Sequence, residues 1–177
     1  SFVPKLLSTP EEKQKLLCET GIDHTMVLNF DQNMAALTAR EFMQRVLKER
    51  LNVGQLVIGY DNKFGHNREE GFEDYCRYGK MLDIQVVEAP QFEPDGVHVS
   101  SSAIRNHLLE GRVKQANALL GYAYSLGGKV VPGFQEGRKM GFPTANLLLE
   151  NPQKLLPQNG VYATWVEVEG YERPLMG

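Results

Sequence analysis

The chain has 177 residues, of which 42% are hydrophobic, and its formal net charge is −3. A chain of this length can bury a core as one large domain or as two small ones. The acidic excess argues against a dedicated nucleic-acid-binding protein, whereas small anionic ligands stay open because local patches recognise them. No apolar run approaches the roughly 20 residues that span a bilayer, and Cys18 and Cys76 are expected to be free thiols. We therefore expect a cytoplasmic protein with neither a nucleic-acid nor a membrane partner.

The first two-thirds of the chain alternates signals for helices and strands. Residues 9–12, Thr-Pro-Glu-Glu, form a capping box with proline at the first helical position, and residues 38–41 form a second box. Apolar runs of strand length occur at 26–28, within 24–30, and at 56–58. The second run ends in a glycine, which is typical of a buried parallel strand.

These signals give a predicted order of elements. A helix starts at 9–12 and ends at Gly21, and a strand lies within 24–30. A helix starts at 38–41 with Phe42, Val46 and Leu47 on one face, and it is followed by a strand at 56–58, a helix over about 72–82 and a strand at 84–87. Strands alternating with helices of this length predict a doubly wound α/β sheet.

The composition and the predicted elements change after Val99. The serines at 100–102 begin a helix that reaches Glu110, and a further helix over 113–120 ends at Gly121. From there the chain is rich in glycine, proline and β-branched residues, with strand candidates at 124–131 and 161–168. We therefore expect an α/β domain over residues 1–121, and the start of a β-barrel or sandwich over residues 122–177.

The segment over residues 137–147 reads Gly-Arg-Lys-Met-Gly-Phe-Pro-Thr-Ala-Asn-Leu. Glycines allow backbone N–H groups to approach a phosphate closely, and the basic pair that begins at Arg138 adds positive charge. Thr144 and Asn146 are neutral oxygen donors two residues apart, so in an extended segment they lie on one side. This pattern suits Mg²⁺ held between protein and nucleotide phosphates. The alternative is a surface β-turn with a solvated basic pair.

Two further segments carry candidate ligands of a nucleotide. Residues 59–65, Gly-Tyr-Asp-Asn-Lys-Phe-Gly, follow the buried strand at 56–58, and ligands of α/β enzymes bind at such carboxyl ends. Residues 100–105, Ser-Ser-Ser-Ala-Ile-Arg, start a helix, where free N–H groups attract phosphate. Taken alone, serines at a helix start are more often only a cap, and Asp61 with Arg68 could equally be a solvated ion pair.

Taken in chain order, the three motifs resemble those of the bifunctional bacterial riboflavin kinase/FAD synthetase. The resemblance extends over nearly the whole chain. Residues 143–146 resemble the Pro-Thr-Ala-Asn signature of riboflavin kinases. Residues 100–105 resemble the Ser-Ser-x-x-Ile-Arg motif that holds the ATP phosphates in the FMN adenylyltransferase module. Residues 59–65 resemble the Gly-x-Asp-x-x-Phe-Gly segment that lines the nucleotide and flavin site, although Asn62 departs from the residue usual in that pattern.

The resemblance implies a fold and a function. The fold is part of a Rossmann-like nucleotidyltransferase domain followed by the start of a riboflavin-kinase-like β-barrel. The function is FAD biosynthesis, in which riboflavin is phosphorylated to FMN and FMN is adenylylated to FAD, with riboflavin, FMN and ATP as small-molecule substrates and Mg²⁺ as cofactor. The implied phosphate-binding residues are Ser100, Ser101, Ser102, Arg105, Gly133, Gly137, Arg138 and Gly141; Gly59, Asp61, Phe64 and Arg68 line the flavin and nucleotide site, and Thr144 and Asn146 bind the metal.

Two parts of the family pattern are missing from these 177 residues. The four histidines include no pair with the His-x-Gly-His spacing of adenylyltransferases, and the kinase's catalytic carboxylate would lie beyond residue 177. We therefore expect an internal piece of a longer enzyme that is inactive alone, and we assign no catalytic residue. Two alternatives stay open: another adenylyltransferase of the same superfamily, and a non-catalytic flavin- or nucleotide-binding module.

Overall fold

The computed structural model describes residues 4–66, 68–91, 96, 99–133, 141, 144–171 and 175–176. The chain divides into two compact units. The central unit is Met26–His98, and the terminal unit joins Ser1–Thr25 to Val99–Gly177. The domain boundary expected near Gly121 falls within the terminal unit and stays a prediction.

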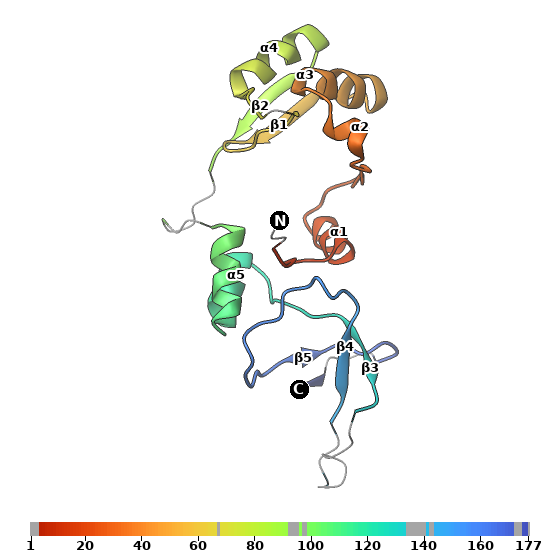
Figure 1. The fold of residues 1–177 in the computed structure, drawn as a ribbon, viewed down its shortest axis with the longest axis vertical. Helices are drawn as coiled ribbons and strands as arrows, with labels where there is room; N and C mark the ends of the chain where they lie inside the picture. Colours follow the sequence, from red (N-terminus) through yellow and green to blue (C-terminus); the bar gives the residue numbers. More distant parts are fainter. Residues whose placement is uncertain are drawn as a thin grey trace. The chain divides into compact units, whose positions relative to one another are not determined.

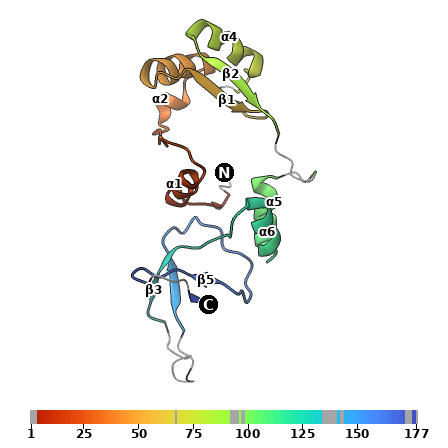
Figure 2. The same cartoon turned by 180° about the vertical axis from the view of Figure 1, so that it is seen from behind.

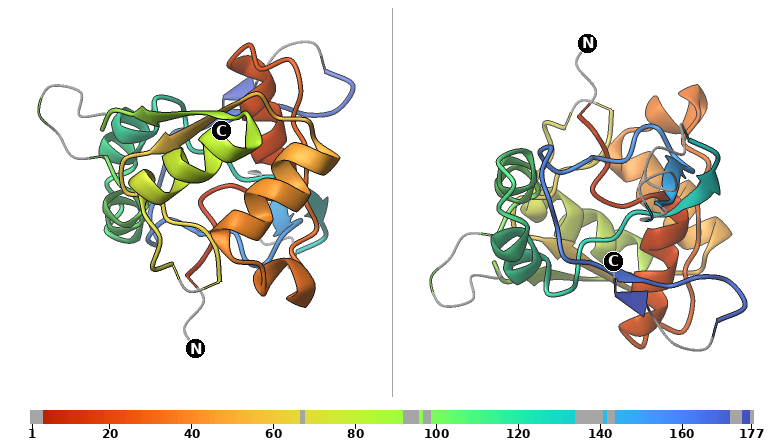
Figure 3. Two further views of the ribbon diagram at one scale, coloured as in Figure 1. Left: turned by 90° about the horizontal axis from the view of Figure 1, so that it is seen from above. Right: turned by 90° about the horizontal axis from the view of Figure 1, so that it is seen from below.

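The central unit is built on a pair of parallel strands, β1 (Gln55–Gly59) and β2 (Gln85–Ala89). The helix α4 (Phe72–Leu82) connects the two strands and packs against β2 (Figures 1 and 3). Leu56 and Ile58 are more buried than their neighbours along β1, as expected when one face of a sheet packs against helices.

Capped helical segments precede this sheet. The short helix α2 (Gln32–Ala35) is followed by α3 (Ala39–Glu41), which continues directly into the π-helix η1 (Phe42–Arg50). Thr38 and Glu41 form the predicted capping box, because the Thr38 Oγ1 accepts the Glu41 N–H at 3.2 Å while the Glu41 carboxylate accepts the Thr38 N–H at 3.0 Å. The helix therefore starts where the sequence predicts.

The core of the central unit is apolar and drawn from neighbouring elements. Tyr75 of α4 is fully buried at its centre, and Ile58 of β1 is 4% exposed. The buried members are Ala39, Met43, Leu47, Ile58, Tyr75 and Ile84.

In the residues of the terminal unit that the structure describes, helices combine with short strands. Helix α1 (Pro10–Glu19) precedes the central unit in the chain, and α5 (Ser101–Leu109) and α6 (Val113–Leu120) follow it and pack side by side (Figure 2). The strand pairs are antiparallel: β3 (Gly128–Val131) with β4 (Asn146–Leu149), and β5 (Trp165–Val166) with β6 (Leu175–Met176). Ile104, Leu108, Ala116 and Leu155 form its buried core.

The structure confirms the α/β class and the predicted helices, but one predicted strand is wrong. Residues 24–30 form no strand, and Met26 and Val27 are 63% and 72% exposed. An apolar run becomes a strand only when a neighbour pairs with it, and no strand in the described ranges does so here. The strands within 124–131 and 161–168 are also shorter than predicted. None of the helices in the described part of the chain has the length and apolar character that a membrane span requires.

Candidate nucleotide and flavin sites

The loop after β1 turns back against the start of α3. Gly59 is the last residue of β1, and its carbonyl accepts the Asn62 N–H at 2.9 Å, which leaves Asp61 exposed at the turn. Gly65 has φ +96°, and a Cβ built there would lie 2.6 Å from the Ala39 backbone nitrogen. Only glycine fits this left-handed position and this close approach. The second glycine of the 59–65 motif is therefore required by packing.

Phe64 of the same loop belongs to the edge of the apolar core. Its ring stacks on Tyr75, with centroids 4.2 Å apart and planes at 14°, and meets Phe42 edge-on at 5.6 Å. Its N–H donates to the Tyr75 hydroxyl at 3.1 Å. Phe64 is half-buried, so these contacts fix the orientation of a ring that the sequence predicts to line a flavin or nucleotide site.

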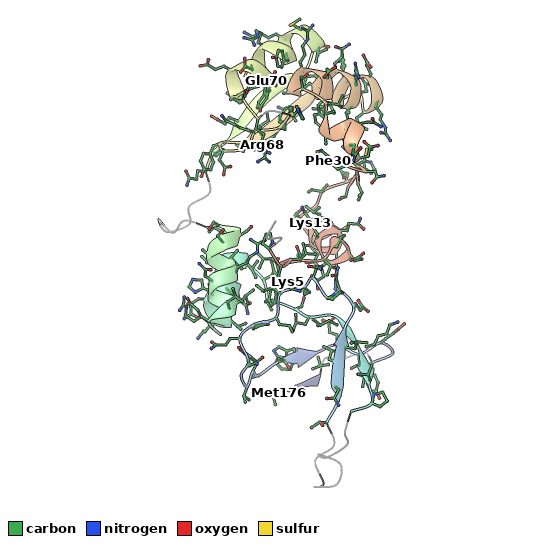
Figure 4. The ribbon with its side chains drawn as sticks, in the orientation of Figure 1. Lys5, Lys13, Phe30, Arg68, Glu70 and Met176 are labelled. Carbon is green, nitrogen blue, oxygen red and sulfur yellow. The ribbon has the colours of Figure 1, made fainter. Side chains whose placement is uncertain are left out.

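Glu70 fixes the far end of the loop. One carboxylate oxygen accepts the Ala39 N–H at 3.1 Å, and the other accepts the Tyr78 hydroxyl at 2.7 Å. The hydrogen bond from Tyr78 to Glu70 raises the pKa of Tyr78. Arg68 is exposed with φ +52°, two residues before Glu70 (Figure 4).

Sequence reasoning missed both Glu70 and Tyr75. The Tyr75 hydroxyl lies 2.9 Å from the Glu70 carbonyl, so both residues help to hold the loop. A carboxylate just after a loop motif and an aromatic residue inside a helix carry no local signal of such contacts. Only the α4 pattern, which places Tyr75 on the apolar face, points toward its burial.

The helix start at 100–105 is capped as predicted. The Ser100 hydroxyl accepts the Ala103 N–H at 3.2 Å, while Ser101 and Ser102 are exposed. Arg105 does not extend freely into solvent, because its Nε donates to the Lys5 carbonyl at 3.0 Å. No local sequence pattern predicts this contact, which spans 100 residues. These residues lie in the terminal unit, whereas 59–68 lie in the central unit.

The structure brings Gly133 and Asn146 together at the end of the β3–β4 pair. Val131 lies opposite Asn146 in the strand register, and a Cβ built at Gly133 would collide with the Asn146 side-chain amide. Asn146 thus occupies the space that a side chain at position 133 would need. Thr144 and Asn146 are both exposed, and Gly141 has φ +83°. Gly137 and Arg138 lie outside the described residues.

These oxygen donors fit Mg²⁺. A hydroxyl and an amide oxygen are neutral hard ligands, and Mg²⁺ bound largely by nucleotide phosphates and water needs only one or two protein ligands. Within the ranges that the structure describes, no group of three or more His, Cys, Asp or Glu side chains is placed to hold a metal. An open pocket of 450 Å³ on the central unit is lined by residues between Asp31 and Arg45, and none of them is a predicted site residue.

Two family models match successive segments of the chain. The family model described as FAD synthetase matches residues 2–103. The chain belongs to the FAD synthetase family. The family model described as riboflavin kinase matches residues 120–176. The first match contains the 59–65 and 100–103 motif residues, and the second contains 137–147.

Relatives named as bifunctional riboflavin kinase/FMN adenylyltransferase align with almost the whole chain. The protein from Escherichia coli (strain K12) is 38% identical over 175 residues, which are 98% of this chain and 55% of that relative. The protein from Listeria monocytogenes is 33% identical over 167 residues, which are 94% of this chain and 52% of that relative. The chain thus spans about half the length of these relatives.

A solved structure is similar over nearly the same extent. The crystal structure of a macrolide-efflux protein from Streptococcus pneumoniae has a TM-score of 0.84 and is 34% identical. The similarity covers 96% of this chain and 54% of that chain. It supports the fold described above.

Proposed function

We propose that the chain carries parts of two modules that make FAD from riboflavin in the cytoplasm. One module phosphorylates riboflavin to FMN with ATP, and the other adenylylates FMN with a second ATP. The observation that carries the proposal is the succession of the two family matches, at 2–103 and 120–176: the first contains the serines of the 100–105 motif, and the second contains the 137–147 segment. Another adenylyltransferase of the same superfamily would give no reason for the Gly-Phe-Pro-Thr-Ala-Asn segment over residues 141–146.

The proposal includes the fold of each module. We assign residues 1–121 to a partial Rossmann-like nucleotidyltransferase domain and residues 122–177 to the start of a riboflavin-kinase-like barrel. The parallel β1–β2 pair with its connecting helix supports the first assignment, and the antiparallel β3–β4 and β5–β6 pairs support the second.

In the kinase step, the chain's own residues position the ATP phosphates. Gly133, Gly137, Arg138 and Gly141 would surround the phosphates, and Thr144 and Asn146 would hold Mg²⁺ through their side-chain oxygens. Bound Mg²⁺ neutralises charge on the phosphates, which is the main requirement of phosphoryl transfer. The Asn146 amide lies so close to Gly133 that a side chain at position 133 would displace it.

In the adenylyl step, a phosphate oxygen of FMN attacks the α-phosphorus of ATP, and pyrophosphate leaves. The N-terminus of α5 receives the departing phosphates, with Ser101 and Ser102 exposed beside it. Ser100 accepts a backbone N–H, so its hydroxyl proton remains a donor. Arg105 adds positive charge one turn into the helix. In the other unit, Gly59, Asp61, Phe64 and Arg68 line the flavin and nucleotide site.

Arg105→Ala tests the anion site. We expect pyrophosphate or ATP to bind about 1.5–3 kcal/mol more weakly, because a hydrogen bond to a charged group is lost. Isothermal titration calorimetry gives the affinity, and Arg112→Ala, an arginine of the same unit, is the matched control. Equal affinities for Arg105→Ala and the unsubstituted chain would show that this site is assigned wrongly.

The proposed activities are tested in a chimera. The aligned 175 residues of the E. coli relative are replaced by those of this chain, and flavins are separated by chromatography after incubation with riboflavin, ATP and Mg²⁺. We expect FMN and FAD from the chimera and neither from the isolated chain. A folded chimera that binds flavin without forming either product would favour the non-catalytic binding module.

A further inference from the structure

A segment near the start of the chain is bound along the C-terminal part of the terminal unit. We call residues 5–12 the strap. The Leu6 N–H donates to the Gln153 carbonyl at 2.8 Å, and the Leu155 N–H donates to the Leu6 carbonyl at 2.9 Å. The Lys5 Nζ donates to the Pro152 carbonyl at 2.7 Å. The strap therefore joins the part matched by FAD synthetase to the part matched by riboflavin kinase.

A buried charge holds this joint. Lys154 is 5% exposed, and its Nζ donates to the Leu7 carbonyl at 2.8 Å and to the Glu12 carboxylate at 2.5 Å. It also lies 4.5 Å from the centroid of the Tyr124 ring. The same Glu12 oxygen accepts the Thr9 N–H at 2.9 Å. A lysine is rarely buried unless it is paired, and here each contact falls on the strap or on the ring beside it.

The strap also contacts Arg105. Its Nε donates to the carbonyl of Lys5, the first residue of the strap. The next two residues, Leu6 and Leu7, are the ones fixed by the backbone pairing and by the Lys154 ammonium. The direction of the Arg105 guanidinium thus depends on a backbone segment that Lys154 immobilises.

We propose that the Lys154–Glu12 pair positions Arg105. Lys154 fixes the strap, the Lys5 carbonyl of the strap fixes the guanidinium, and the guanidinium faces the phosphates of the nucleotide. The last step rests on the proposed function, whereas the first two rest on the contacts alone. Lys154 is then a positioning residue for the adenylyl site, supplied by the segment that matches the riboflavin kinase family.

The test follows the Arg105 Nε proton by nuclear magnetic resonance in the full chain. Hydrogen exchange of this proton with water is compared between the unsubstituted chain and Lys154→Met. We expect at least a tenfold faster exchange in Lys154→Met, because the strap no longer holds the Lys5 carbonyl in place. Lys13→Met is the matched control, because Lys13 is exposed on α1 (Figure 4). In this variant the Arg105 Nε proton should exchange as slowly as in the unsubstituted chain.

Glu12→Gln is the second variant, because it removes the charge of the partner and keeps a hydrogen-bonding group of the same shape. We expect an intermediate acceleration in this variant, which also serves if Lys154→Met does not fold. Unchanged Arg105 exchange in a folded Glu12→Gln or Lys154→Met chain would overturn the proposal.

Affinity for pyrophosphate separates this proposal from the proposed function. We expect Lys154→Met to weaken pyrophosphate binding several-fold, with no further loss when Arg105→Ala is added. Faster Arg105 exchange together with unchanged pyrophosphate affinity would support the positioning role of Lys154. It would also show that Arg105 does not bind the phosphates. Additive losses in the double variant would instead show that Lys154 acts on binding independently of Arg105, and the proposal would fail.

Discussion

The two units bury their cores in different ways. The apolar core of the central unit comes from elements that follow one another between Ala39 and Val86. That of the terminal unit gathers Leu7, Ile104, Tyr124 and Leu155 from opposite ends of the chain. The contacts of the first core close shorter loops than those of the second, which needs the strap to join the two ends of a long loop. The terminal unit therefore depends on polar contacts between more distant parts of the chain, such as Leu6 with Gln153, whereas the Ala39–Glu70 hydrogen bond of the central unit spans 31 residues.

The polar groups within the two units differ in the same way. In the central unit, Glu70 accepts bonds from a backbone N–H and from Tyr78. In the terminal unit, Lys154 brings a full positive charge into the interior and is balanced by Glu12. A buried ion pair tolerates replacement of both partners better than loss of one. The comparison thus predicts that the units respond to different substitutions.

Tyr75→Ala should give the largest effect. We expect a loss of about 3–5 kcal/mol in the stability of the central unit, because a fully buried ring is removed from the core. Hydrogen exchange read by mass spectrometry should show faster exchange in α4 and η1 and unchanged exchange in α5 and α6.

Tyr75→Phe is its control. This variant keeps the ring and removes the hydroxyl that contacts the Phe64 N–H and the Glu70 carbonyl. We therefore expect a smaller loss of stability, about 1–2 kcal/mol. Equal loss of protection in both units after Tyr75→Ala would contradict the separation of the two cores.

Lys154→Met should act on the terminal unit. Removing the lysine leaves the Glu12 carboxylate without its partner, at a cost of about 3 kcal/mol, toward the lower end for buried pairs because the Glu12 side chain keeps 24% exposure. Thermal unfolding gives the stability, and exchange should rise in α1 and α5 while α4 is unchanged.

The double variant Glu12→Leu with Lys154→Met sharpens this result. With both charges removed, we expect most of the lost stability to return. A double variant no more stable than Lys154→Met alone would mean that the ion pair is not the origin of the effect.

The local features of the fold could be predicted from sequence, and the long-range ones could not. The capping boxes at Thr9 and Thr38 and the apolar run at 56–58 are encoded by adjacent residues, so helices and strand appear where expected. The strand predicted from the apolar run at 26–28 was wrong, because a strand also needs a pairing strand from elsewhere in the chain. The same holds for the candidate sites: the serine cap at Ser100 was local, whereas the contact of Arg105 with Lys5 spans 100 residues.

Thr38→Ala should cost the central unit about 1 kcal/mol. The substitution removes the hydroxyl that accepts the Glu41 N–H at the start of α3. Urea unfolding gives the change in stability. Thr9→Ala provides the comparison in the terminal unit: Thr9 is 9% exposed, and its capping partner Glu12 also binds Lys154, so we expect the larger loss there. Equal losses would show that the cap and the ion pair of the terminal unit act independently.

The smallest effect concerns pH and the Glu41 carboxylate of the central unit. Hydrogen bonds from the Thr38 N–H, and then from its hydroxyl, lower the pKa of Glu41. A carboxyl whose folded pKa lies below its unfolded value stabilises the fold above the unfolded pKa, near 4.3, and loses this contribution as the pH falls through the folded pKa. The urea midpoint of the unsubstituted chain should therefore exceed that of Glu41→Gln at pH 7, and the difference should shrink toward pH 3. Glu69→Gln, which changes an exposed carboxylate of the same unit, is the charge-matched control. A difference that persists unchanged at pH 3 would show that the charge of Glu41 is not its origin, because the carboxylate loses that charge as the pH falls through its folded pKa.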